Sequence, residues 1–228
     1  MTTLNTVLSI SESVGIDDHR FIGQMMSRNQ RIATSEIIGT QPFGFDMRPM
    51  NYLLYSQNRP LLSTLRAADK EFEQYLNFGA TGWVNYIAYQ GDMTSAEIGA
   101  CEYEITSANK TIVLGSLPSI GATEYIVKTG DFLQIDRYAY IATANVQRGG
   151  GLTVNIPVHR TIMTTLASPM TAVIGQYGTT QSIGGNTYTG VTFPVILQDY
   201  PTYTLIPMTN DSFIQWTGTF KAFEYVLT

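Results

Sequence analysis

Residues 191–227 read VTFPVILQDYPTYTLIPMTNDSFIQWTGTFKAFEYVL. Three runs in this stretch, 191–198, 202–208 and 213–227, are rich in β-branched and aromatic residues, and Pro, Asn and Gly separate them. Such runs, bounded by turn-forming residues, are typical of short β-strands. The stretch therefore predicts antiparallel strands joined by tight turns, and the expected fold class is mainly β.

The same pattern extends towards the N-terminus. Short strand candidates follow one another at close spacing, which suggests an antiparallel β-sandwich or β-barrel. No fixed-period repeat is present, and this argues against solenoids and propellers. The further strand candidates are residues 102–106, 110–115, 131–136, 138–146, 152–159 and 170–176.

The first 50 residues are mixed in character. Phe43, Phe45 and Met47 alternate as in a half-buried strand, and flanking prolines place that strand at an edge or keep it short. Residues 1–27 show neither clear helical nor clear strand periodicity. We expect them to form an N-terminal arm that becomes ordered against a neighbouring molecule.

One amphipathic helix is predicted over residues 59–77. Asn58 fits the cap position, Pro60 suits the first turn, and Gly79 suits a left-handed cap after the helix. Apolar residues between these limits recur at steps of three or four and form one stripe. The stripe consists of Leu61, Leu65, Ala68, Phe72 and Leu76.

A second, short helix is predicted near residues 94–100. Thr94 and Glu97 have the spacing of a capping box, in which each side chain accepts the other residue's backbone N–H. The strands before residue 91 and after residue 169 resemble one discontinuous sandwich, made of 28–91 and 169–228. Residues 92–168 are then expected to form an inserted small β-domain.

Composition restricts the classes of function. The 228 residues are only 14% charged, with a net charge of −5 and a pI of about 5.0, whereas soluble domains average about 25% charged residues. The acidic balance argues against specific nucleic-acid binding. The sequence contains no run of 18 apolar residues, so no transmembrane helix is predicted. Residues Met1–Asn5 lack the basic start of a secretory signal. We therefore expect no membrane insertion.

Charge is unevenly distributed along the chain. Of the 31 charged residues, only Arg160, Asp199, Asp211, Lys221 and Glu224 follow residue 150. A neutral surface tends to associate. The C-terminal third is therefore either deeply buried or covered by other subunits. The second interpretation is favoured because so long a segment cannot all be core.

No catalytic residue, cofactor-binding residue or metal ligand is predicted, and no cofactor is expected. His19 follows Asp17 and Asp18 directly, so these side chains diverge, and His159 ends a strand candidate as an ordinary packed residue. Cys101 is the single cysteine, which excludes an internal disulfide, and we expect it to be a small packed hydrophobe. Neither a nucleophile elbow nor a phosphate-binding loop occurs.

Paired carboxylates are the remaining route to catalysis. Glu102 and Glu104 share one face of a strand candidate, about 6–7 Å apart from the strand rise, a separation that suits an inverting glycosidase. Nothing in the sequence supplies the raised pKa that a general acid needs. We therefore predict that the protein is not an enzyme. The other carboxylates considered are Glu97, Asp131 and Asp136.

Aromatic residues provide an alternative function. Tyr138 and Tyr140 share a strand face, and with Trp83, Tyr86 and Tyr89 they could form a platform that stacks on sugar rings. A β-rich chain with 11% aromatic residues also places many of them in cores and subunit contacts. A carbohydrate- or receptor-binding module is therefore kept as the alternative.

Several segments resemble structural proteins in the tails of contractile-tailed bacteriophages. The resemblance covers more than half of the chain, and none of its segments is a catalytic signature. One stretch is similar to the phrase G-D-F-I-Q-I … Y-x-V-T-A-D-V … V-x-I-x-x-x-R of tail and baseplate proteins. This stretch consists of KTGDFLQIDR (128–137), YIATANV (140–146) and VNIPVHR (154–160). The other segments are SRNQRIATSEI (27–37), QPFGFDMRP (41–49), YSQNRPLL (55–62), YPTYTLIP (200–207) and WTGTFKAFE (216–224).

The resemblance implies a virion protein with a β-sandwich or barrel that assembles into a ring around the tail axis. Its expected position is the distal end of the tail tube or the baseplate hub. The implied partners are copies of itself, in six-fold or three-fold symmetry, and neighbouring tail tube and baseplate proteins. Assembly in the host cytoplasm is expected. An acidic balance suits a channel through which DNA slides, because Lys and Arg clusters would bind its phosphates.

Overall fold

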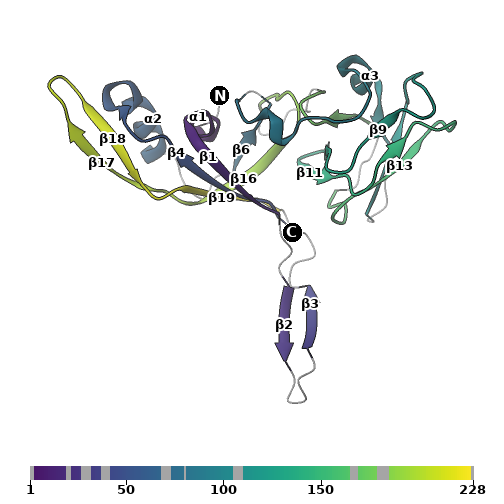
Figure 1. Cartoon of the computed structure of the whole chain (residues 1–228), viewed down its shortest axis with the longest axis horizontal. Helices are drawn as coiled ribbons and strands as arrows, with labels where there is room; N and C mark the ends of the chain where they lie inside the picture. The colour runs from purple at the N-terminus through teal and green to yellow at the C-terminus, as the bar shows by residue number, and fades with distance from the viewer. Residues whose placement is uncertain are drawn as a thin grey trace. The chain divides into compact units, whose positions relative to one another are not determined.

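The computed structural model is mainly β, with 43% strand and 16% helix, which confirms the predicted fold class (Figure 1). Two compact units are present: unit 1 comprises Met1–Tyr75 with Pro194–Thr228, and unit 2 comprises Leu76–Phe193. The structure describes residues 3–18, 22–26, 32–36, 42–67, 73–79, 81–104, 110–164, 169–178 and 185–226. The expected insertion, 92–168, is nested within unit 2.

Unit 1 is built on an antiparallel sheet that curls as a half-barrel (Figure 1). Phe43 and the β4 residues Phe45 and Met47 are buried, as their alternation predicts. Each boundary between the two units falls within a strand, β6 or β16. The strand order is β1 (Ser11–Asp17), β4 (Gly44–Pro49), β19 (Phe220–Glu224), β16 (Thr192–Asp199) and β6 (Gln74–Asn77).

Unit 1 contains a second antiparallel sheet. It contains β17 (Thr202–Pro207), β18 (Ser212–Thr217) and β5 (Leu53–Leu54), in that order. All three strands predicted after residue 190 are confirmed, but the third is divided into β18 and β19. Gly218 separates these two with φ +101, a conformation that glycine adopts without steric strain.

The predicted helix 59–77 is wrong at both ends. Helix α2 (Tyr55–Ala67) begins before Asn58, whose side chain amide donates to the Leu54 carbonyl at 2.9 Å, and Pro60 lies inside the helix. Residues 74–77 form strand β6 instead, and Gly79 has no positive φ. Short apolar spacings do not distinguish a helix from a buried strand. Ala68 and Phe72 of the predicted stripe lie outside the described residues.

The expected arm over residues 1–27 is packed into unit 1 along most of its described length. Helix α1 (Thr3–Ser9) buries Leu4, Val7 and Leu8 completely and contacts β4 and α2. Strand β1 follows α1 and pairs with β4. Further along, β2 (Ile22–Met26) pairs with β3 (Ile32–Glu36) as a two-stranded ribbon. Residues 1–27 were expected to pack against a neighbouring molecule. Helix α1 and strand β1 instead pack against other elements of the same chain.

Unit 2 consists of small antiparallel sheets, and each strand candidate between residues 102 and 176 contains at least one strand. One sheet has the order β11 (Tyr138–Ile141), β10 (Phe132–Ile135) and β15 (Val173–Ile174). A pair is formed by β12 (Val146–Gln147) and β9 (Tyr125–Val127). The largest has the order β13 (Val154–Pro157), β8 (Thr111–Gly115), β7 (Glu102–Tyr103) and β14 (Met170–Thr171).

Unit 2 also contains the predicted short helix. Helix α3 (Ser95–Ala100) begins after Thr94, and both hydrogen bonds of the capping box are present. The Glu97 carboxylate accepts the Thr94 N–H at 2.7 Å, and the Thr94 hydroxyl accepts the Glu97 N–H at 3.3 Å. A short 3-10 helix, η1 (Val84–Tyr86), precedes it. Within the described ranges, no helix is long and apolar enough to cross a membrane.

The packing of α1 gives a testable stability effect. Leu8→Ala removes a fully buried side chain, so the free energy of unfolding should fall by about 2–5 kcal/mol. Ser9→Ala, at an exposed neighbouring position, should change it by less than about 0.5 kcal/mol. Urea titrations of the two variants measure both values. Equal stability of the Leu8 variant and the unaltered protein would show that α1 is a free arm.

Candidate functional site

The residues considered for catalysis have separate structural roles. The His159 imidazole accepts the Ile141 N–H through Nδ1 at 3.0 Å, and its ring packs edge-on against Tyr140. Glu102 and Glu104 are both exposed, and Asp136 lies in a turn with φ +53. His19 lies outside the described residues. Within the described part of the chain, no three His, Cys, Asp or Glu side chains are grouped so that they could hold a metal ion.

Two of the five residues of the suggested sugar platform are interior, and Trp83, Tyr86 and Tyr89 are half-buried. Tyr138 and Tyr140 are buried, and the Tyr140 hydroxyl accepts the Met163 N–H at 3.0 Å. Tyr86 packs against Phe132, with ring centroids 4.9 Å apart. Since a sugar must reach the face of an aromatic ring in order to stack on it, Tyr138 and Tyr140 cannot act as the platform.

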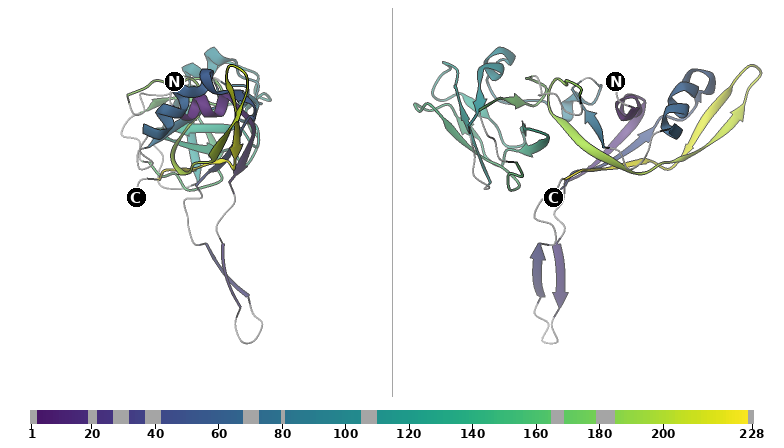
Figure 2. Two further views of the ribbon diagram at one scale, coloured as in Figure 1. Left: turned by 90° about the vertical axis from the view of Figure 1, so that its left-hand side faces the viewer. Right: turned by 180° about the vertical axis from the view of Figure 1, so that it is seen from behind.

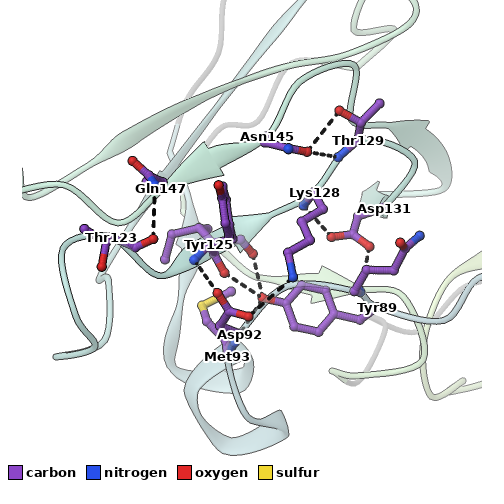
Figure 3. Close-up of polar contacts among 12 residues, drawn as sticks. Tyr89, Asp92, Met93, Thr123, Tyr125, Lys128, Thr129, Asp131, Asn145 and Gln147 are labelled. Atoms are coloured by element: carbon purple, nitrogen blue, oxygen red, sulfur yellow. Dashed lines mark hydrogen bonds and ion pairs between the residues drawn. The ribbon is translucent and has the colours of Figure 1, made fainter.

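A polar network in unit 2 centres on Asp131 (Figure 3). This carboxylate is fully buried and accepts the backbone N–H of Gln90 at 2.8 Å and that of Lys128 at 2.7 Å. Burial raises the pKa of Asp131 above the ordinary aspartate range, and the two hydrogen bonds oppose that rise. Gly130, with φ +96, allows the turn that places Asp131 there.

A second part of the network fastens the segment around Asp92 to strand β9 (Figure 3). Tyr89 donates its hydroxyl hydrogen to the Ile126 carbonyl at 2.7 Å, and burial raises the pKa of this hydroxyl. The Asp92 carboxylate accepts the Tyr125 N–H at 2.7 Å, and this bond lowers the pKa of Asp92. The Lys128 Nζ lies 3.5 Å from Oδ1 of Asp92. The network therefore joins backbone segments, which is a structural task.

Two more polar residues of the stretch 128–160 lie inside unit 2. The Gln134 side chain accepts the Thr192 N–H at 2.8 Å, and the fully buried Arg160 donates to the Ala139 carbonyl at 2.6 Å. The Arg160 guanidinium also lies over the Tyr140 ring, 5.2 Å from its centroid. No role was predicted from the sequence for Gln134 or Arg160. For Gln134 the available signal was a polar residue within an apolar strand pattern; Arg160 follows its strand candidate and had no such signal.

Cys101 is buried, as expected. Its Sγ–H donates to the Glu97 carbonyl at 3.3 Å. Burial is the main cause that raises the pKa of the Cys101 thiol to about 11, and the negative charge of Glu97 adds to it. The thiol therefore stays protonated near neutral pH, as is usual for a buried cysteine that only packs against its neighbours.

Unit 1 carries an apolar surface on the β17–β18 hairpin, which lies beside α2 (Figure 2). Leu205, Ile206 and Met208 are 44%, 37% and 47% exposed. We call residues 205–208 the hairpin end. Among the described residues β17 pairs only with β18, so its other edge is open. The chain has no charged residue between Asp199 and Asp211. Apolar side chains, an open edge and no charge together form a surface suited to association.

A pocket of about 280 Å³ lies where this hairpin meets α2. Its aromatic rings pack edge to face: the centroids of Tyr203 and Trp216 are 5.4 Å apart, as are those of Trp216 and Phe220. Arg66 lies at the pocket and donates to the Tyr203 hydroxyl at 2.6 Å. We call this site the aromatic pocket; its apolar and aromatic lining consists of Leu62, Leu65, Tyr200, Pro201, Tyr203, Trp216 and Phe220.

Comparison of the sequence with models of protein families gave no match, and comparison with curated proteins gave no match either.

The Asp131 network gives a pH-dependent prediction. Asp131→Asn removes one of the two acceptor oxygens that bond the Gln90 and Lys128 N–H groups but also removes the charge whose burial raises the pKa, so the free energy of unfolding should fall by no more than about 1 kcal/mol near neutral pH. Because the folded pKa is raised, the folded chain binds a proton at pH values where the unfolded chain has lost it. Stability contributed by Asp131 therefore rises as the pH falls through that window. The deficit of the variant should widen on acidification.

Asp136→Asn is the matched control, because Asp136 is exposed and asparagine tolerates its positive φ. Denaturant titrations at several pH values measure both variants. A constant deficit for Asp131→Asn across the acid range would contradict the raised pKa.

Burial of Cys101 predicts low reactivity. With a pKa of about 11, roughly one thiol in a thousand is ionised at mildly alkaline pH, and the thiolate is the reactive form. Native protein should resist iodoacetamide, whereas protein unfolded in urea should be alkylated completely. Mass spectrometry after timed quenching measures both. Alkylation of the native protein at the rate of the unfolded chain would show that Cys101 is accessible.

Proposed function

We propose that the protein is a structural subunit of a contractile bacteriophage tail that forms a closed ring with copies of itself. The ring belongs to the distal tail tube or the baseplate hub and has no catalytic activity. The observation that carries this proposal is the uncharged, apolar surface of the β17–β18 hairpin. A monomer with such an open strand edge is prone to associate. The sequence resemblance to phage tail proteins supports the choice of particle.

The distribution of charge in the structure also supports association. Of the five charged residues after residue 150, Arg160 and Glu224 are buried. The long C-terminal segment therefore offers solvent only Asp199, Asp211 and Lys221 as charged groups. Since a surface with so little charge is poorly protected against association, cover by other subunits is the better of the two sequence interpretations.

The partners in this proposal are further copies of the chain and neighbouring tail tube and baseplate proteins. A closed ring forms when one patch meets a different patch on the next copy and the rotation closes; three-fold or six-fold symmetry is proposed. The acidic balance, with a net charge of −5, suits a ring through which DNA slides without binding. Carbohydrate binding loses support because Tyr138 and Tyr140 are buried.

Ring formation is directly measurable. Purified protein should elute as a discrete species of three or six copies in size-exclusion chromatography with light scattering, and electron micrographs should show closed rings. Dilution and added salt should dissociate it little, because the proposed contacts are apolar rather than ionic. A monomer at every concentration, or density for this chain at a fibre tip or on the capsid of a reconstructed virion, would contradict the proposal.

A further inference from the structure

We propose that the hairpin end of one copy, Leu205–Met208, inserts into the aromatic pocket of the next copy. This inference rests on the proposed ring and names the two surfaces that meet in it. Both surfaces belong to unit 1, and they lie at different positions along the same β17–β18 hairpin.

The lining of the aromatic pocket selects an apolar guest. Leucine, proline and aromatic side chains form most of its wall, and the nearby guanidinium of Arg66 already donates to the Tyr203 hydroxyl. Trp216 is buried, and its indole N–H has no acceptor among the described residues. The wall also carries the polar groups of Arg66, Tyr203 and Trp216, so an inserted strand must offer the indole N–H a backbone carbonyl. An aliphatic side chain needs only apolar contact and a volume of this size.

The hairpin end supplies such a guest. Leu205 and Ile206 are neighbours in a strand, so they point to opposite faces of the sheet, and both are exposed. Natural edge strands are commonly protected by lysine, by a bulge or by a covering element. No Lys, Arg, Asp or Glu occurs from residue 200 to residue 210. The guest therefore brings no charge of its own to the pocket, whose charged lining residue, Arg66, is exposed.

The geometry of the hairpin directs this contact to another copy. Tyr203, in the pocket wall, lies near the start of β17, and Met208 follows five residues later, about 16 Å along an extended strand. The hairpin end cannot return to its own pocket without breaking the β17–β18 pairing, which extends from Thr202↔Thr217 to Pro207↔Ser212. A contact between two different patches is head-to-tail, which is the arrangement that generates rings.

A leucine-to-aspartate pair tests the hairpin end. Leu205→Asp should dissociate the ring and raise its dissociation constant by about tenfold or more, since a charge would have to enter an apolar pocket. Leu152→Asp is the matched control, because Leu152 is 87% exposed and lies in unit 2. It should leave the ring intact. Both variants should keep the circular dichroism spectrum of the unaltered protein, because both side chains are exposed.

A pocket variant makes the test directional. Tyr203→Asp should also be monomeric, and an equimolar mixture with Leu205→Asp should form one-to-one dimers, because one intact hairpin end and one intact pocket remain. Circular dichroism checks folding of each variant. Arg66→Glu, at an exposed position, replaces Tyr203→Asp if that variant does not fold.

Different failures contradict different proposals. Unaltered protein that never forms rings would overturn the proposed function. Rings that survive Leu205→Asp or the pocket variant would leave that function standing and overturn the hairpin contact. Loss of the ring with Leu152→Asp, or a mixture that stays monomeric, would likewise overturn the contact.

Discussion

Antiparallel pairing between residues 192–207 and residues 212–224 is the constraint on which unit 1 depends. The backbone hydrogen bonds of this ribbon set the register Val195↔Glu224 at one end and Pro207↔Ser212 at the other. Because side chains alternate between faces, a slip by one residue would expose every buried one. Strand β4 then pairs with β19, and β5 pairs with β18. Helix α2 contacts the β5–β18 part of the sheet, so the aromatic pocket exists only when this register is correct.

In unit 2, polar side chains form hydrogen bonds with backbone groups that apolar packing alone would leave without partners. Short strands leave many backbone N–H and C=O groups without a neighbouring strand, and a buried group of this kind is costly unless it is hydrogen-bonded. Asp131, Gln134, Tyr89 and Arg160 each bond a backbone group of another segment. Three of these residues, Asp131, Gln134 and Arg160, lie in the stretch 128–160. Their bonds explain why polar residues stand there in a protein that is proposed to have no catalytic role.

The proposed assembly follows from a conflict between solubility and association. An exposed strand edge with apolar side chains is unfavourable for a monomer, and the β17–β18 hairpin has both features without a charged residue in β17. The acidic balance of the whole chain does not remedy this, because its charges lie mostly before residue 150. Contact with a second copy resolves the conflict, since it buries the hairpin end against a wall of the same character.

Local patterns determined the β-rich fold class, the positions of most strands and the capping box at Thr94, because period-two alternation and caps depend on neighbouring residues alone. The same patterns misplaced the helix expected over 59–77, since a spacing of four fits a buried strand such as β6 as well. Only tertiary structure showed that Tyr140 is interior. The aromatic pocket likewise combines α2 residues such as Leu65 with Trp216, some 150 positions later in the chain. Contacts across such separations arise from sheet pairing, which no local pattern specifies.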